Sequence, residues 1–243
     1  MKKIIIISSL ILYVALDIMS QRKQDVVTTN LFGEKDQISI LTIKFEKGKS
    51  HNHPLMAIWL ADESGRYIQT LYVAESIGKG FFKRVDRSTG MWQAGEIQRP
   101  ATLPYWAHQR GVKNEYGTFM PTPKQPVPDA YTGATPPGSF VFHLIPKEKL
   151  SGKYKVYLEI NQSWDWNEYW HNNKFPDDKE YKTSSQPAVV YEANINSNES
   201  GKEVDFMPVG HSHYAGKDGK LYPELKTLTT ALDIVKKCTV RVE

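Results

Sequence analysis

The segment Lys153–Asn161, which reads Lys-Tyr-Lys-Val-Tyr-Leu-Glu-Ile-Asn, decides the fold class. Apolar and mostly polar side chains alternate along it, and this period of two is typical of a strand with one face in the core. Leu150-Ser151-Gly152 supplies a turn directly before it. The alternation predicts that Tyr154, Val156, Leu158 and Ile160 face inward, and that Lys155, Tyr157 and Glu159 face outward.

Further segments on both sides carry strand patterns, and Glu63-Ser64-Gly65-Arg66 joins two of them as a hairpin turn. Seven short strands with turns between them predict an all-β fold, namely an antiparallel immunoglobulin-like β-sandwich with one or two short helices. The other expected strands are Ile38–Phe45, Leu55–Ala61, Tyr67–Ala74, Ser139–Ile145, Ala188–Ile195 and Thr239–Val242; the expected helices are Ala101–Arg110 and Pro223–Lys236.

The stretch Arg99–Gly138 has a different character because it holds eight of the 14 prolines. Proline cannot donate to a sheet ladder, so we expect a long proline-rich insertion here rather than core strands. Loops of this length inside a compact domain are often functional. Since no shift in composition marks a boundary, we expect one domain over residues 21–243.

The first residues predict export. Lys2 and Lys3 precede an apolar run from Ile4 to Leu16, which is the form of a secretory signal peptide over residues 1–20. The run is shorter than the roughly 20 residues that span a bilayer. An uncleaved N-terminal anchor is the alternative. A periplasmic or otherwise exported protein is the expected outcome.

Charge and cysteine content narrow the function classes. The net charge is +4, and no basic run or stripe suggests a nucleic-acid partner. Sequence signatures of hydrolases and phosphate loops are also missing. The single cysteine, Cys238, has no intrachain partner, and its alternation with Val240 and Val242 predicts a buried thiol on a strand.

The sharpest chemical motif lies inside the proline-rich insertion. Asp129–Thr135 reads Asp-Ala-Tyr-Thr-Gly-Ala-Thr and matches D-x-x-[S/T]-G-A-T. This pattern resembles the acceptor site for covalent FMN in extracytoplasmic electron-transfer subunits, where a flavin transferase joins FMN to the final threonine through a phosphoester. The resemblance implies the following cofactor-binding residues: Thr135 as acceptor, Thr132 as the motif's first hydroxyl, Gly133 and Ala134 as small residues that leave room, and Asp129 as a residue that orients the loop or helps to hold a metal during transfer.

A structural interpretation of the same residues stays open. Thr132–Gly138 is also a good turn sequence before the strand expected at Ser139. A turn of this kind would need Gly133 for its backbone conformation and would tolerate Thr135 without any flavin.

The order of several motifs along the chain is similar to the predicted periplasmic proteins catalogued as domain of unknown function 2271. The resemblance covers about residues 36–195 and implies an exported β-rich domain, without supplying a reaction. The motifs that carry it are Ala57–Asp62, Gly65–Leu71, Asp129–Thr135 with Gly138, and Gly152–Asn161.

Two other features are candidates for binding. His51/His53 and His211/His213 are His-x-His pairs that could each offer two imidazoles to a metal, but solvated loop histidines are the simpler interpretation. The aromatic segment Trp164–Trp170 is too dense to be buried by one hairpin, so it could contact a ligand or partner. The alternative is structural, with two rings capping the sandwich and two lying under the proline-rich insertion.

The sequence therefore supports two functions. The leading hypothesis is a flavinylated electron carrier with FMN on Thr135, served by a flavin transferase and a membrane redox protein; no catalytic residue is assigned. The alternative is a cofactor-free periplasmic binding or assembly module that docks a membrane partner or a glycan.

Overall fold

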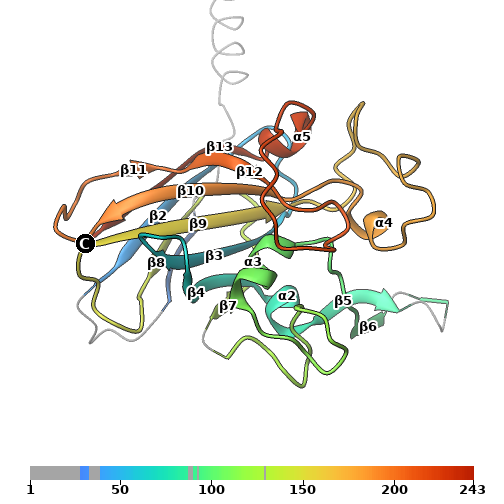
Figure 1. The fold of residues 1–243 in the computed structure, drawn as a ribbon, viewed down its shortest axis with the longest axis horizontal. Helices are drawn as coiled ribbons and strands as arrows, with labels where there is room; N and C mark the ends of the chain where they lie inside the picture. Colours follow the sequence, from blue (N-terminus) through green and yellow to red (C-terminus); the bar gives the residue numbers. More distant parts are fainter. Residues whose placement is uncertain (1–27, 33–38, 87–89, 92, 129) are drawn as a thin grey trace, which may run out of the picture.

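A five-stranded and a six-stranded β-sheet lie face to face in the structure, a computed structural model that describes residues 28–32, 39–86, 90–91, 93–128 and 130–243 (Figure 1). In the five-stranded sheet, neighbouring strands pair antiparallel except β1 and β8, which are parallel. Its strands, in spatial order, are β1 (Thr28–Phe32), β8 (Phe140–Leu144), β2 (Leu41–Lys47), β13 (Val235–Val242) and β11 (Val204–Asp205).

The six-stranded sheet is likewise antiparallel except at one edge, where β4 and β7 run parallel. Its strands, in spatial order, are β12 (Met207–His211), β10 (Val189–Asn196), β9 (Lys153–Asn161), β3 (Leu55–Asp62), β4 (Tyr67–Ala74) and β7 (Tyr131–Gly133). The mainly antiparallel β-sandwich expected from the sequence is confirmed.

The remaining elements are short. A separate hairpin and the helix before it lie together near β4 and β7 (Figure 1). These elements are β5 (Phe81–Asp86), β6 (Gln93–Glu96) and α2 (Glu75–Lys79); the other helices are α3 (Pro104–Arg110), α4 (Tyr181–Ser184) and α5 (Thr229–Leu232).

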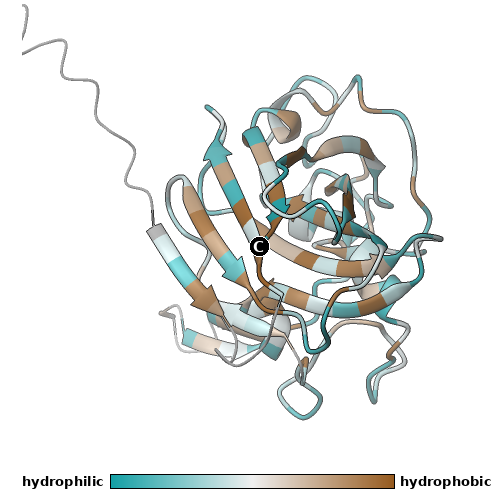
Figure 2. Ribbon diagram, turned by 90° about the vertical axis from the view of Figure 1, so that its left-hand side faces the viewer, coloured by the Kyte–Doolittle hydropathy of each residue, from teal (hydrophilic) through white to brown (hydrophobic). Residues whose placement is uncertain are grey.

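The main core fills the space between the two sheets. Figure 2 shows hydrophobic residues alternating with hydrophilic ones along several strands, as expected for strands with one face in a core. Phe45 and Phe140 stack with ring centroids 4.6 Å apart, and Leu158 of β9 lies in the same cluster. Burying each such side chain contributes roughly 1.5–3 kcal/mol, so the sandwich is held mainly by these contacts.

The outer face of the six-stranded sheet is also buried, which the sequence did not predict. Trp59, Tyr157 and Trp106 belong to a second hydrophobic cluster that joins this face to α2, α3 and the proline-rich insertion. Glu159, expected to face outward into solvent, is fully buried. The insertion is therefore a third layer over the sheet rather than a free loop.

The observed bounds of the elements differ most from the predicted ones where tertiary packing opposes the local sequence pattern. The strands Lys153–Asn161 and Tyr67–Ala74 were predicted with their observed bounds. The helix predicted at Pro223–Lys236 is wrong: only Thr229–Leu232 is helical, and Val235 begins β13. Pairing with β2 gives these residues ladder hydrogen bonds and core contacts that a surface helix would lack.

Two smaller predictions are also resolved. The helix expected at Ala101–Arg110 begins at Pro104, because proline suits the first helical position and Ala101 is buried in the preceding turn. Cys238 is confirmed as a buried core thiol, 3% exposed, and burial raises its pKa.

Candidate functional site

The Asp129–Thr135 motif lies at the β7 edge of the six-stranded sheet. Gly133 pairs with Ala74 in the parallel β4–β7 ladder and does not have a positive φ. A Cβ at Gly133 would meet only ordinary contacts, of which the nearest is a Tyr72 ring carbon at 3.7 Å. The interpretation as a glycine-dependent turn is therefore wrong, because this backbone is extended. Asp129 lies outside the described residues.

Helix α2 fixes the middle of the motif. A Cβ at Gly78 would lie 2.9 Å from Cγ2 of Thr132 and 2.8 Å from Cγ1 of Val73, so helix and strand approach more closely than a larger residue would allow. Thr132 is thus held by the α2–β7 contact. Ala134 follows the strand and is exposed.

Thr135 places a hydroxyl in an unusual setting. Its Oγ1 is covered and has no hydrogen-bond partner within the described part of the chain. The neighbouring Tyr72 hydroxyl donates to the carbonyl oxygen of Gly133 at 2.9 Å. Burial raises the pKa of Tyr72, while a hydrogen-bond contact with the Thr135 side chain lowers it; the two hydroxyls are thus close, but they form no well-aligned hydrogen bond. Unpartnered buried hydroxyls are rare in proteins and call for an explanation.

A pocket of about 450 Å³ adjoins the motif. Phe81, which is 47% exposed, supplies an aromatic surface, and Phe82, which is 8% exposed, also lines the pocket. The Nζ atom of Lys79 is paired with Glu75 at 2.7 Å, and Lys83 also interacts electrostatically with Glu75, although no ion pair within 4 Å joins these two described residues. The lining residues are Leu55, Ala74, Glu75, Ser76, Lys79, Phe81, Phe82, Lys83, Gly133, Ala134 and Thr135.

A second pocket of about 720 Å³ continues from the first, and the two share Leu55, Ser76, Phe82 and Lys83. Its far side is formed by Arg99 and Trp164. The two pockets therefore adjoin, and together we call them the trough; it reaches from the β7 edge to the start of the aromatic segment. Both volumes lie in the range of small-molecule sites.

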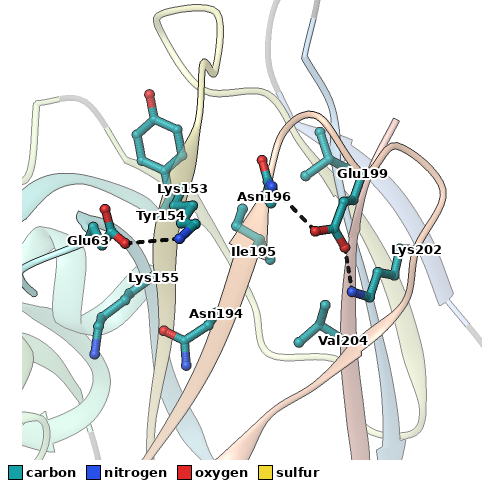
Figure 3. A pocket seen from close by; sticks show the side chains of 11 residues that line it. Glu63, Lys153, Tyr154, Lys155, Asn194, Ile195, Asn196, Glu199, Lys202 and Val204 are labelled. Atoms are coloured by element: carbon teal, nitrogen blue, oxygen red, sulfur yellow. Dashed lines mark hydrogen bonds and ion pairs between the residues drawn. The ribbon is translucent and has the colours of Figure 1, made fainter.

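A third hollow, shown in Figure 3, differs in its electrostatics. The Nζ atom of Lys153 lies 3.5 Å from a Glu63 carboxylate oxygen, and Lys202 is paired with Glu199. Asn196 also donates to Glu199 at 3.3 Å. Since the lining charges pair with one another, this hollow carries little charge to offer a ligand.

The aromatic segment Trp164–Trp170 divides into exposed and buried rings. Trp164 and Trp166 are each 53% exposed and Tyr169 is 42% exposed, whereas Trp170 is buried. The Asn167 carboxamide oxygen accepts hydrogen bonds from the backbone N–H groups of Tyr169 and Trp170. The exposed rings are therefore presented by an ordered loop.

The histidine pairs are not brought together into a metal site. His211 stacks on Tyr222 with ring centroids 5.4 Å apart, and His213 stacks on Tyr214 at 4.4 Å. Burial lowers the pKa of both imidazoles, so the prediction of freely solvated loop histidines is wrong for this pair. Within the described ranges, no three His, Cys, Asp or Glu side chains are grouped to hold a metal ion.

Sequence reasoning singled out the motif but missed the trough that it borders. Lys83 and Phe82 precede the proline-rich insertion and Arg99 begins it, and no pattern linked them to Thr135. Packing of β5 beside α2 brings Phe82 and Lys83 to the motif. In the sequence, only the short segment Phe81–Arg84, in which two aromatic residues precede two basic ones, could have indicated these partners of the motif.

The fold and this site define a mainly antiparallel β-sandwich with a basic, aromatic trough at one sheet edge. Comparison with protein families, curated proteins and solved structures finds no match for the chain. The resemblance to domain of unknown function 2271 thus depends on the sequence motifs alone. Among the described residues, no helix has the length and apolar character needed to cross a membrane.

Proposed function

We propose that this chain is an exported electron carrier with FMN joined covalently to Thr135. The observation that carries the proposal is the covered hydroxyl of Thr135, which has no well-aligned hydrogen bond and only a contact with Tyr72, at the border of a pocket with basic and aromatic lining. A hydroxyl kept without a partner forgoes the stabilisation of a hydrogen bond. Use as an acceptor for a phosphoester explains why a threonine stands there.

The residues around Thr135 suit the chemical groups of FMN. The Lys83 ammonium can neutralise the phosphate, and the exposed ring of Phe81 offers a surface for the flavin ring. When bound, FMN supplies the redox chemistry, while the protein positions the ring and tunes its surroundings. A membrane redox protein is the expected partner in electron exchange.

Attachment requires a second enzyme and a donor. A flavin transferase acting on flavin adenine dinucleotide forms the bond from phosphorus to Thr135 Oγ1 as the phosphoanhydride bond breaks. AMP leaves and the hydroxyl proton passes to a base of the transferase, without any change in oxidation state. Because Oγ1 is covered in the unmodified protein, the Thr135 side chain has to turn toward the pocket during transfer.

The test is expression in the periplasm together with a flavin transferase, followed by intact mass measurement and visible absorbance. We expect one FMN-sized adduct on the wild-type chain and on Thr135→Ser, which keeps the hydroxyl. Thr135→Val should be folded and unlabelled. No adduct on the wild-type chain, or an adduct that persists in Thr135→Val, would overturn the proposal.

A second candidate function is favoured by the exposed rings of Trp166 and Tyr169. In this alternative the chain is a cofactor-free periplasmic binding or assembly module that docks a membrane partner or glycan, with sugar rings stacking on the aromatic side chains. Titration with a chitin oligosaccharide tests the glycan version. Saturable binding that Trp166→Ala and Tyr169→Ala each weaken supports it, and equal affinity of these variants and the wild-type chain contradicts it.

A further inference from the structure

The second pocket of the trough is lined by three positive charges and by no acidic side chain, although Glu75 of the adjoining pocket interacts electrostatically with Lys83. Lys83, Arg84 and Arg99 line it, and no aspartate or glutamate does. None of the three forms an ion pair with a residue that the structure describes. The hollow in Figure 3 shows the opposite arrangement, because its lysines are paired with glutamates. The second pocket is thus the more strongly anion-attracting of the two.

Arg99 is the least exposed of the three cations that line this pocket. Its guanidinium carbon lies 4.5 Å from the centre of the Phe82 ring, which holds the group in place. Its Nε is covered and has no hydrogen-bond partner among the described residues. Burial lowers the pKa of Arg99, and no neighbouring carboxylate offsets this effect. Apart from the Phe82 ring, no described side chain balances the charge of this half-buried cation, so an anion in the pocket would stabilise it.

Two further residues point to a ligand in the same place. Ser163 also lines the pocket, and its Oγ is covered and unpartnered within the described part of the chain. Trp164 has a φ of 61°, a conformation that is strained for a bulky residue. Hydrogen bonds from its backbone N–H to Ser184 and from its indole N–H to Lys182 hold it there, with the ring half exposed. Such strain is found where a side chain is held for binding.

We propose that this pocket binds a small molecule that joins an anionic oxygen group to a flat ring. Arg99 anchors the phosphate, sulfate or carboxylate group, while Lys83 and Arg84 add positive charge around it. The exposed face of Trp164 takes the ring. Since Arg99, Arg84 and Trp164 lie outside the Asp129–Thr135 motif, this site does not depend on flavin attachment to Thr135.

Calorimetric titration of the unmodified protein with 1-naphthyl phosphate tests this site. We expect saturable binding that is tighter than that of inorganic phosphate, because only the ester offers a ring to Trp164. Neutral 1-naphthol should bind more weakly than the ester, since it lacks the anion. Arg99→Gln should weaken binding of the ester by at least about tenfold, which is the effect of losing a charge-assisted hydrogen bond. Lys83→Gln should weaken it less, because this lysine is exposed.

Matched variants separate this site from general charge effects and from the flavin site. Arg66→Gln makes the same change in charge at a residue outside both pockets of the trough and should bind the ester like the wild-type chain. Thr135→Val should also bind like the wild type, whether or not the flavin proposal holds. Absence of saturable binding at concentrations on the order of 1 mM, or equal affinity of Arg99→Gln and Arg66→Gln, would overturn the proposal.

Discussion

The buried carboxylate of Glu159 accepts a hydrogen bond of 2.7 Å from the backbone N–H of Trp106. Its other oxygen accepts from the backbone N–H of Tyr105 at 3.2 Å. Two donors at the start of α3 are thereby satisfied by a side chain of β9, and this contact ties the third layer to the sheet. Burial is the largest influence on this carboxyl and raises its pKa to about 8, although the two backbone donors act in the opposite direction.

This contact predicts a stability that depends on pH. The pKa of Glu159 is higher in the folded state than its ordinary value of 4.5, so between these two values the folded state binds more protons than the unfolded state. The free energy of unfolding should therefore fall, by a few kcal/mol at most, as the pH rises from about 4.5 to about 8. Urea unfolding at about pH 5 and about pH 8 measures the change.

Glu159→Gln is the control for that prediction. The amide cannot ionise, so the difference in stability between the two pH values should shrink relative to the wild-type chain, while other titrating groups remain the same. An equal loss of stability in both proteins would show that Glu159 does not cause the pH dependence.

Gly78→Ala should destabilise the protein by about 1–3 kcal/mol, because the new methyl group would press on Thr132 and Val73. Gly133→Ala is the matched change in the facing strand. It should alter stability by no more than about 0.5 kcal/mol, since its Cβ would meet only ordinary contacts. Thermal unfolding of both variants decides the matter. A larger loss in Gly133→Ala than in Gly78→Ala would contradict the α2–β7 packing described above.

Thr135→Val should leave the unmodified protein as stable as the wild type or about 1 kcal/mol more stable, because the lost hydroxyl has no well-aligned hydrogen bond and only a contact with Tyr72. Thr70→Val is the matched control. Its buried hydroxyl accepts a hydrogen bond of 2.9 Å from the indole Nε1–H of Trp106, so its loss should cost about 1–3 kcal/mol. Chemical unfolding of the two variants compares them directly. Equal destabilisation of both would indicate that the Thr135 hydroxyl is bonded.

Tyr191→Phe and Tyr181→Phe should have opposite effects. The Tyr191 hydroxyl is covered without a partner in the described part of the chain, so its removal should stabilise by up to about 1 kcal/mol. The Tyr181 hydroxyl lies 2.9 Å from the carbonyl oxygens of both His171 and Ser185 and shares its single proton between them, so its removal should destabilise by about 1 kcal/mol. The midpoint temperature of thermal unfolding shows whether each variant is more or less stable than the wild type. A change in the same direction for both variants would contradict the hydrogen-bonding described for the two hydroxyls.

Local alternation predicted much of the sandwich because it reports directly on strand formation. Tyr67–Ala74 and Lys153–Asn161 were located with their observed bounds, and the buried thiol of Cys238 followed from the same period. The short edge strand β7 was missed because proline-rich sequence around it carries no alternation. The candidate site was predicted only as the motif, since its basic and aromatic partners come from separate segments of the chain.

The sequence by itself determined that the chain forms strands, since side chains at alternate positions must share one face of an extended backbone. Only the tertiary structure decided what covers each face. Glu159 occupies an outward position by alternation, yet it is buried because α3 and the proline-rich insertion lie over that face. Tertiary packing likewise placed Thr135 and Lys83 around the same pocket, because neither local propensity nor spacing encodes how distant segments come together.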